Sequence, residues 1–498
     1  MHIRLVTFLI LPVTYSWIQT SNAQFNQRIL TLQDAIGIAK EQSPDALNSK
    51  QSFRASFWEY RSFKASYLPS LQLNANIPRV QRAITPVTDP VTGEQLFVPQ
   101  QYISSDAILS LTQKIGFSGG SIFIRSGLEA MYNITDSSVI SSFLSTPVNI
   151  GLVQPIFQFN PYRWERKIQP IKYSQAKQQY LADVEQISIT TTNYFFYLLN
   201  AQIELKIAQT NQSNYDTLYR IAQGRFQMGK IAENDLLLLE LNYLKAQAAV
   251  ENANLELGNA LFRFKSYLRI KDTVPVVLVP PSGIEFFTVN PDQAVAFAKN
   301  NSPVYMDFRK RLTEAERNVH QARLDGRFDA ELTAVIGLTK NAETLPDAYK
   351  KPLDQQQVSL GISIPIYDWG VARGRIKIAE SEEEIVKNSV EQEILDFQQN
   401  VYLKVVQFNM QKNQVTIAAK SDTVARKNFE VTKGRYLIGK MNSILDLNNA
   451  QIETDNSQKA YYQSLLTFWR SFFELRKLTL YDFQANRPII FSFEDIRL

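Results

Sequence analysis

Cysteine is absent from the 498 residues of this sequence, and histidine occurs only twice. Without cysteine the chain forms no disulfide, binds no metal through thiolates and carries no lipid on an N-terminal cysteine. Transition-metal sites built from several histidines or cysteines also lack their ligands. We therefore expect no metal site and no bound cofactor.

Neither His320 nor the short glycine cluster between Gly116 and Gly120 predicts catalysis. His320 stands on a charged helical face beside Arg317 and Arg323, where a solvated side chain is more common than a ligand or a general base. The glycine cluster lacks the Lys-Ser/Thr ending and the following helix of a phosphate-binding loop. The sequence therefore favours a protein that is not an enzyme.

Long apolar runs are scarce. The run from Leu5 to Ile18 is followed by small residues at 21–23, which predicts a secretory signal peptide over residues 1–23. The alternative is an N-terminal membrane anchor, but a spanning helix needs about 20 apolar residues and this run is shorter. No later run reaches that length, so we expect no membrane-spanning helix after the signal.

Charge of one sign is not in excess, since 53 Lys and Arg residues stand against 48 Asp and Glu residues. No basic cluster is interleaved with exposed aromatic residues, so nothing in the sequence indicates a nucleic-acid partner. The acidic run at 380–384 has basic neighbours and is typical of a solvated helical face.

Two nearly identical stretches organise the chain: Gly-Arg-Phe-Gln-Met-Gly-Lys at 224–230 and Gly-Arg-Tyr-Leu-Ile-Gly-Lys at 434–440. The same offset of 210 residues superimposes Gly151 on Gly361, so we infer an internal duplication. Each stretch lies between two long amphipathic runs. We therefore expect the tip of a helical hairpin at each, with both glycines giving the turn its freedom in φ.

The runs after Pro161 and after Asp368 predict the longest helices. Between Ile187 and Phe226, twelve positions alternate in spacings of four and three, and ten of them are apolar or aromatic, as in a coiled coil. A helix over 161–226 would reach roughly 100 Å. The seam is narrow and rich in Ala, Tyr, Thr and Gln, which fits a hollow helical assembly around water; a solid coiled-coil rod is the alternative.

Six stretches alternate between apolar and polar residues with the two-residue period of a half-buried strand. Each alternation covers seven to nine residues, which is close to the ~9 to 11 residues that a tilted strand needs to cross a bilayer. Turn-rich segments at 85–93 and 132–147 predict exposed loops, and Gly119-Gly120 predicts a tight hairpin turn. The expected strands lie at 71–77, 109–115, 122–128, 148–156, 332–338 and 358–366.

The duplication sets the expected domain boundaries. An opening helix is also repeated, because 35–44 matches 294–303, and the extra length of the first half falls mostly in a hairpin over 109–128. We expect a signal peptide at 1–23, a first structural repeat at 24–270, a linker at 271–290, a second structural repeat at 291–478 and a C-terminal tail at 479–498.

Several short motifs stand at the junctions between these elements. They include Leu68-Pro-Ser-Leu71 before the first strand, Gln154-Pro-Ile-Phe157 before the first long helix and Ile364-Pro-Ile-Tyr-Asp-Trp-Gly370 before the second. With the repeat, their order resembles the TolC-like outer-membrane efflux factors over almost the whole chain after the signal. The segments 159–164 and 479–483 look like a variant common in Bacteroidetes.

The resemblance implies an α+β membrane protein in the cell outer membrane. Its homotrimer would build one transmembrane β-barrel, continued through the periplasm by a long α-helical coiled-coil barrel. Family members usually supply four strands per protomer, so the hairpin over 109–128 departs from the pattern, as does Leu324-Asp-Gly-Arg-Phe328 in place of Leu-Pro before a strand. The implied partners are outer-membrane lipid, a periplasmic adaptor and an inner-membrane pump.

The resemblance also implies a periplasmic gate just beyond the hairpin tips. The segment 444–450 is similar to the family's constricting pattern, which places Asp446 on the first acid and Asn449 in the place of the second. Asp235 takes the corresponding place in the first half. A threefold ring of Asp446 carboxylates would repel itself when closed and favour cations at the mouth. The alternative is that Asp446 caps or solvates a helix.

The hairpin tips are the implied docking surface for the adaptor. A trimer would present six similar tips, which suits a hexameric adaptor. The tip residues are Gly224, Arg225, Gly229, Lys230, Gly434, Arg435, Gly439 and Lys440.

We therefore expect a passive outer-membrane channel, the exit duct of a tripartite efflux or type I secretion system that exports small molecules or polypeptides. The alternative is a structural periplasmic coiled-coil protein of the envelope, without channel activity. A third interpretation, a metal exporter, gains no support from a chain so poor in histidine and cysteine.

Overall fold

The structure is a computed structural model that describes residues 27–134, 138–272, 274–440 and 443–493. The expected signal peptide lies outside these ranges. The chain divides into two compact units. The large unit holds Ala39–Asn193 and Glu285–Leu498, and the small unit holds Met1–Ile38 and Tyr194–Ile284.

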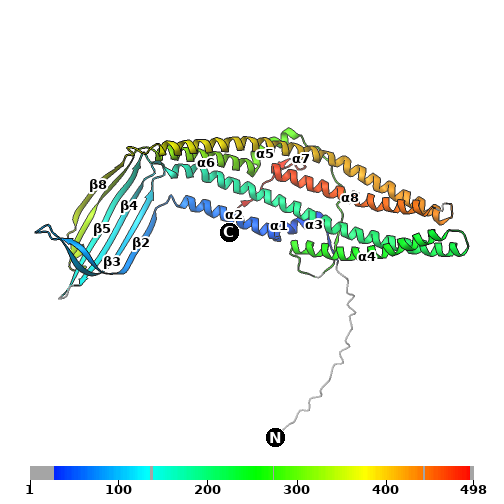
Figure 1. The fold of residues 1–498 in the computed structure, drawn as a ribbon, viewed down its shortest axis with the longest axis horizontal. Coiled ribbons are helices and arrows are strands. Elements are labelled where there is room, and N and C mark those ends of the chain that lie inside the picture. Colours follow the sequence, from blue (N-terminus) through cyan, green and yellow to red (C-terminus); the bar gives the residue numbers. More distant parts are fainter. Residues whose placement is uncertain (1–26, 135–137, 273, 441–442, 494–498) are drawn as a thin grey trace, which may run out of the picture. The chain divides into compact units, whose positions relative to one another are not determined.

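The large unit contains one antiparallel sheet of six strands, in the order β2-β3-β4-β5-β7-β8 (Figure 1). All six strands expected from the alternating pattern are confirmed. The hairpin over 109–128 forms the end of the β3–β4 ladder nearest its turn, from Leu109 paired with Ser126 to Lys114 paired with Ser121, so it joins the sheet rather than folding beside it. The strands are β2 (Ser70–Thr88), β3 (Gln95–Lys114), β4 (Ser121–Ile134), β5 (Val139–Ile156), β7 (Asp329–Ala342) and β8 (Leu353–Ser363).

One segment expected to be a loop is largely strand, and the expectation is wrong there, because 139–147 belongs to β5. In the other, β2 continues to Thr88, so the expected loop over 85–93 is shortened to 89–93. Ser145, within 139–147, is fully buried, and its hydroxyl donates to the Ala348 carbonyl. Serine-rich sequence suits the polar face of a strand as well as a loop, so composition misplaced the boundary.

An aspartate cap starts the long helix that follows the sheet. The Asp368 carboxylate accepts the N–H groups of Gly370 at 2.9 Å and Ala372 at 2.7 Å, which satisfies donors that a helix start leaves free. These bonds lower the pKa of Asp368. Gly370 has a φ of 88°, which favours glycine. The helix α7 (Val371–Leu437) begins directly after it.

The helices of the large unit pack along the seam expected from the heptad spacing. On α7 the side chains of Val401, Phe408, Val415, Phe429 and Tyr436 are buried at intervals of seven or fourteen residues, and α8 packs along this helix. The other helices with residues in the large unit are α1 (Leu32–Gln42), α2 (Pro44–Ala65), α3 (Pro161–Gln227), α5 (Pro291–Asn301), α6 (Pro303–Asp325) and α8 (Ile444–Thr479).

The repeated Ser-Pro pairs start equivalent helices in the two halves. At α2, the Ser43 hydroxyl oxygen accepts the Ala46 N–H at 3.1 Å, and at α6 the Ser302 oxygen accepts the Val304 N–H at 3.3 Å. Both serines are buried, and a proline follows each at the first helical position, where its missing N–H costs nothing. The duplication therefore includes these two helices.

A bidentate ion pair joins α6 to α7. Arg311 Nη1 lies 2.7 Å from Glu393 Oε2, and Arg311 Nη2 lies 2.9 Å from Glu393 Oε1. The bond from Arg311, with a further one from Ser389, lowers the pKa of Glu393 to about 2.

We expect the Arg311→Gln variant to be less stable than the unchanged protein at neutral pH, and this difference in stability should disappear in acid. The folded-state pKa of Glu393 lies below its ordinary 4.5, so the contribution of the pair is complete above that pH and disappears as the pH falls towards 2. At pH 7 the variant should melt a few degrees at most below the unchanged protein, and the two Tm values should converge below pH 4.5. Thermal melts at several pH values measure the gap, and a gap that stays constant contradicts the assignment.

A buried ion pair connects α3 and α8 within the large unit. The Glu185 side chain is 1% exposed, and Arg476 Nε and Nη2 lie 2.9 and 3.0 Å from its two oxygens. Arg476 Nη1 also donates to Asp482, which lies in the short strand β9 (Tyr481–Asp482). β9 pairs with β10 (Arg487–Pro488), so the same arginine ties the C-terminal tail to the helices.

The small unit pairs the second half of α3 with α4 (Glu233–Tyr267). Tyr194 and Tyr267 stack with ring centroids 4.8 Å apart, and Phe195 and Phe264 are buried against each other. No helix among the described residues is both long and apolar enough to span a membrane.

A short parallel pair of strands completes the small unit. β1 (Arg28–Leu30) pairs with β6 (Val276–Leu278), which lies in the expected linker. Gln202 of α3 fixes β6, because its side chain donates to the Val276 carbonyl at 2.7 Å and accepts the Leu278 N–H at 3.1 Å.

Candidate functional site

The first hairpin tip ends α3 with a Schellman motif. Gly229 has a φ of 66°, and its N–H donates to the Phe226 carbonyl at 2.8 Å. The N–H of Lys230 donates to the Arg225 carbonyl at 2.9 Å. These two bonds satisfy carbonyls that a helix end leaves free, and they turn the chain sharply.

The second tip repeats the motif at the end of α7. Gly439 has a φ of 73°, and its N–H donates to the Tyr436 carbonyl at 3.1 Å. The N–H of Lys440 donates to the Arg435 carbonyl at 3.0 Å. The two copies therefore share their backbone hydrogen bonds as well as their sequence.

Only one glycine of each pair has the expected turn conformation. Gly224 and Gly434 lie inside the last turns of α3 and α7, and neither has a positive φ. A Cβ built on either would meet nothing within 4 Å. The expectation that both glycines form the turn is corrected: Gly229 and Gly439 carry it, because only the position after the helix takes the left-handed conformation.

Each tip also exposes a large apolar side chain that the sequence reasoning missed. Met228 is 62% exposed and Ile438, its equivalent in the second half, is 65% exposed. Lys230, Arg435 and Lys440 are exposed as well. Each tip thus presents an exposed apolar side chain, called here the apolar knob (Met228 or Ile438), beside a cation. The 210-residue offset aligns Met228 with Ile438, so the duplication was the sequence signal from which both could have been predicted.

Asp446 lies in the first turn of α8, next to its cap. Its backbone N–H donates to the hydroxyl oxygen of Ser443 at 3.2 Å, so Ser443 is the cap and the Asp446 carboxylate is not. Asp446 and Asn449 are both exposed, and three residues apart they share one face of the helix. The opposite face is held by the buried Ile444 and Leu447.

Asp235 lies in the first turn of α4, in the small unit. It is half-buried, and the cap residue Ala232 makes no side-chain hydrogen bond to this helix start. Glu233 in the same turn adds a second acid, and both negative charges interact favourably with the positive N-terminal end of the helix dipole. Asp235 therefore has a structural role, because it stabilises a helix start that lacks a side-chain cap. The start of α8 already has the Ser443 cap, so it depends less on the charge of Asp446.

One face of the six-stranded sheet is apolar and exposed. Residues paired across the strands lie on the same side of a sheet, so the apolar members of the alternating patterns form rows. A contiguous apolar surface of this kind marks contact with lipid or with another protein. Examples are Leu71, Leu73, Ile124, Ile150, Ile336 and Val358, each more than 40% exposed.

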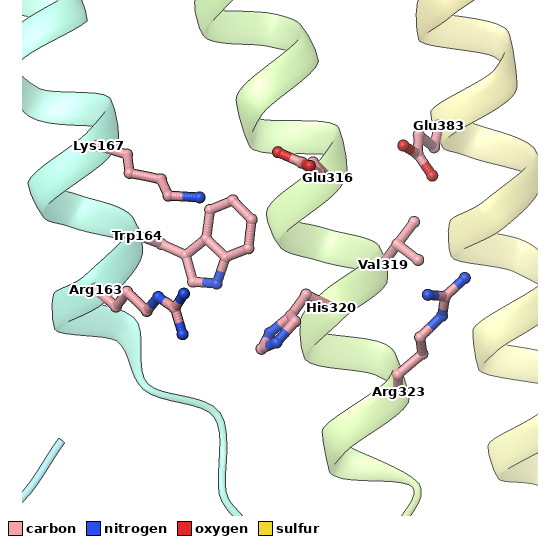
Figure 2. A pocket seen from close by; sticks show the side chains of 8 residues that line it. All are labelled: Arg163, Trp164, Lys167, Glu316, Val319, His320, Arg323 and Glu383. Atoms are coloured by element: carbon pink, nitrogen blue, oxygen red, sulfur yellow. The ribbon is translucent and has the colours of Figure 1, made fainter. Parts of the chain in front are cut away.

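A polar pocket of about 480 Å³ lies between the start of α3, the end of α6 and α7 (Figure 2). Figure 2 shows Trp164 and His320 facing each other across it, with ring centroids 5.6 Å apart. Lys167 Nζ lies 4.3 Å from the Trp164 centroid, and Arg323 pairs with Glu380 at 2.9 Å.

His320 is exposed at this pocket, as the sequence predicted for a solvated residue. The lining carries both signs of charge, with Glu316 and Glu383 facing three cations. Because acidic and basic side chains line the pocket together, the charge of the lining favours neither anions nor cations.

The sequence of the chain identifies its family. A model of the outer membrane efflux protein family matches residues 127–268 and 297–479, which together exceed half of the chain. The chain belongs to the outer membrane efflux protein family. The TolC-like resemblance is confirmed, and with it a general role in efflux through the outer membrane in a family of channels rather than enzymes.

Solved structures of outer-membrane channels share the fold. The CmeC channel of Campylobacter jejuni is 17% identical with a TM-score of 0.65, and the match covers 93% of this chain and 88% of that one. The open MtrE channel of Neisseria gonorrhoeae is 16% identical, covering 92% and 91%, with a TM-score of 0.62. VceC of Vibrio cholerae is 13% identical, covering 92% and 97%, with a TM-score of 0.60. A comparison with curated protein sequences finds no match.

Proposed function

We propose that this protein is the passive, homotrimeric exit duct of a tripartite efflux or type I secretion system. In this proposal the sheets of three protomers form one β-barrel in the outer membrane, and the long helices form a coiled-coil tunnel in the periplasm. An inner-membrane pump supplies the energy.

One observation carries the proposal: a sheet with an exposed apolar face leads directly into a 67-residue helix. Within the large unit, β8 is followed by the Asp368 cap and then by α7, whose seam packs on α8. An apolar sheet face suits lipid, whereas at ~1.5 Å per residue the helix reaches roughly 100 Å into an aqueous compartment. Membership of the efflux family supports the same assignment.

The hairpin tips are the proposed docking points for a periplasmic adaptor. Both present the same backbone motif, an exposed apolar knob and exposed lysine. The tip residues Gly224, Arg225, Gly229, Lys230, Gly434, Arg435, Gly439 and Lys440 would form this surface, with Met228 and Ile438 added to it. Asp446, with Asn449 beside it, and Asp235 remain the proposed gate residues.

Planar-bilayer recording tests the duct. Protein extracted from membranes with detergent should insert and give discrete single-channel currents, and adaptor and pump should co-purify with it. The rival interpretation, a structural coiled-coil protein of the envelope, expects extraction without detergent and no current. That second result would end the duct proposal.

A further inference from the structure

The six-stranded sheet has two free edges. Among the described residues, β2 pairs only with β3 and β8 pairs only with β7, so the outer edges of a 19-residue and an 11-residue strand have no strand partner. A free edge exposes a row of backbone N–H and C=O groups, and proteins cover or pair such rows. Here the two edges adjoin an exposed apolar face. Once that face contacts lipid, no water is available to form hydrogen bonds with the N–H and C=O groups of the edges.

The two edges are complementary in direction. Every neighbouring pair in the sheet is antiparallel, and the number of strands is even, so β2 and β8 run in opposite directions. The β8 edge of one copy can therefore continue the antiparallel pattern on the β2 edge of another. Repeated head to tail, this contact is heterologous, and a heterologous contact forms a ring when the rotation between neighbouring copies closes.

The sheet also carries the stagger that closure requires. The pairing can be followed straight across the strands from the first residue of β2, and it arrives on β8 six residues before the last residue, Ser363. Closing a sheet needs such a shift along the strands. The row is Ser70, Thr112, Phe123, Gly151, Val335 and Gln357.

The β3–β4 hairpin is built into this sheet at its turn. Asn160, before α3, donates to the carbonyls of Gly116 and Phe117 at 3.3 and 3.1 Å, and Gln154 of β5 donates to the Ser118 carbonyl at 3.1 Å. On the strand itself, Phe123 lies over Gly151, where an added Cβ would stand 2.3 Å from the ring. The absence of a side chain at Gly151 therefore fits the hairpin.

We infer that copies of this chain join β8 to β2, and that each copy contributes six strands to the closed sheet instead of the family's usual four. The number of copies rests on the function proposed above: three copies would supply eighteen strands. Because the diameter of a closed sheet grows roughly linearly with strand number, the lumen at this level would be roughly 1.5 times as wide as with four strands per copy.

The cysteine-free chain allows a disulfide test of the joint. By the stagger, Gln357 should face a β2 residue about six positions beyond Ser70 on the neighbouring copy. We would combine Gln357→Cys with Asn74→Cys or with Asn76→Cys and oxidise the membrane-embedded protein. The matched control is Gln357→Cys with Thr88→Cys, at the far end of the same strand.

At least one of the first two double variants should give covalent trimers on denaturing gels, while the control and each single variant remain monomers. If the protein still conducts but the disulfide forms only within one chain, or does not form at all, the β8–β2 joint is wrong and the duct proposal stands. Cross-linked rings of another copy number keep the joint and contradict the trimer. Absence of both current and cross-link contradicts both.

A second pair of variants tests the strand count. Gln72→Cys with Ser110→Cys links β2 to β3, and Arg125→Cys with Asn149→Cys links β4 to β5, at positions that are directly paired. Both disulfides should form within one chain and leave the conductance unchanged. If neither forms while the β8–β2 link does, the hairpin lies outside the closed sheet and the six-strand inference is wrong.

Discussion

Replacing Arg476 with methionine is expected to lower the free energy of unfolding of the large unit by about 3–5 kcal/mol. Methionine keeps a long side chain for packing but removes the bidentate partner of Glu185, whose side chain is 1% exposed. In the intact protein burial opposes the charge of Arg476, but the bonds to Glu185 and the nearby Asp482 outweigh burial and raise the pKa of Arg476. The variant leaves a carboxylate in a site that water does not reach.

Urea denaturation of the detergent-extracted protein, followed by helical circular dichroism, measures this loss. Arg470→Met is the matched control: its side chain is 42% exposed and its Nε lies 3.8 Å from Glu474 Oε1, so about 1 kcal/mol or less should be lost.

The double variant Arg476→Met with Glu185→Leu should recover most of the stability, because no buried charge remains. If Arg476→Met alone is no less stable than the control, Glu185 is compensated by another cation. Lys40 is the candidate, since burial lowers its pKa and Glu185 opposes that shift.

The sequence predicted the elements whose signal is local and periodic. The alternating stretches became the six strands, and the heptad seam became buried positions such as Val401 and Phe408. The tips were predicted because the chain contains them twice, and the structure gives both copies the same backbone bonds.

Features that depend on distant residues were not predictable in this way. Glu185 and Arg476 are 291 positions apart, and no local sequence pattern around either residue predicts that the two will pair. Ser145 lies in a segment whose composition favours a loop, but its hydroxyl is satisfied by Ala348, 203 positions away. In both cases the partner that makes a polar residue acceptable in the interior comes from the second half of the chain.

Replacing Asp446 with asparagine is expected to lower the cation selectivity of the channel several-fold. The carboxylate is exposed on the first turn of α8, and Ser443 already caps that turn, so in the proposed duct the charge would be free to act on passing ions. In the proposed trimer three such groups would repel one another; at an assumed separation of about 10 Å the repulsion is about 0.4 kcal/mol per pair in water, and more in a narrow mouth. Removing them should reduce both this repulsion and the local excess of cations.

Reversal potentials across a KCl gradient measure the change, and Asn449→Asp is the matched opposite. It adds a second acid to the same helix face and should raise the selectivity for cations. Acids near a helix start also stabilise the helix by about 0.3–1 kcal/mol, so Asp446→Asn should lower Tm only slightly. If Tm falls but the reversal potential of Asp446→Asn stays that of the unchanged protein, Asp446 serves the helix end and not the gate.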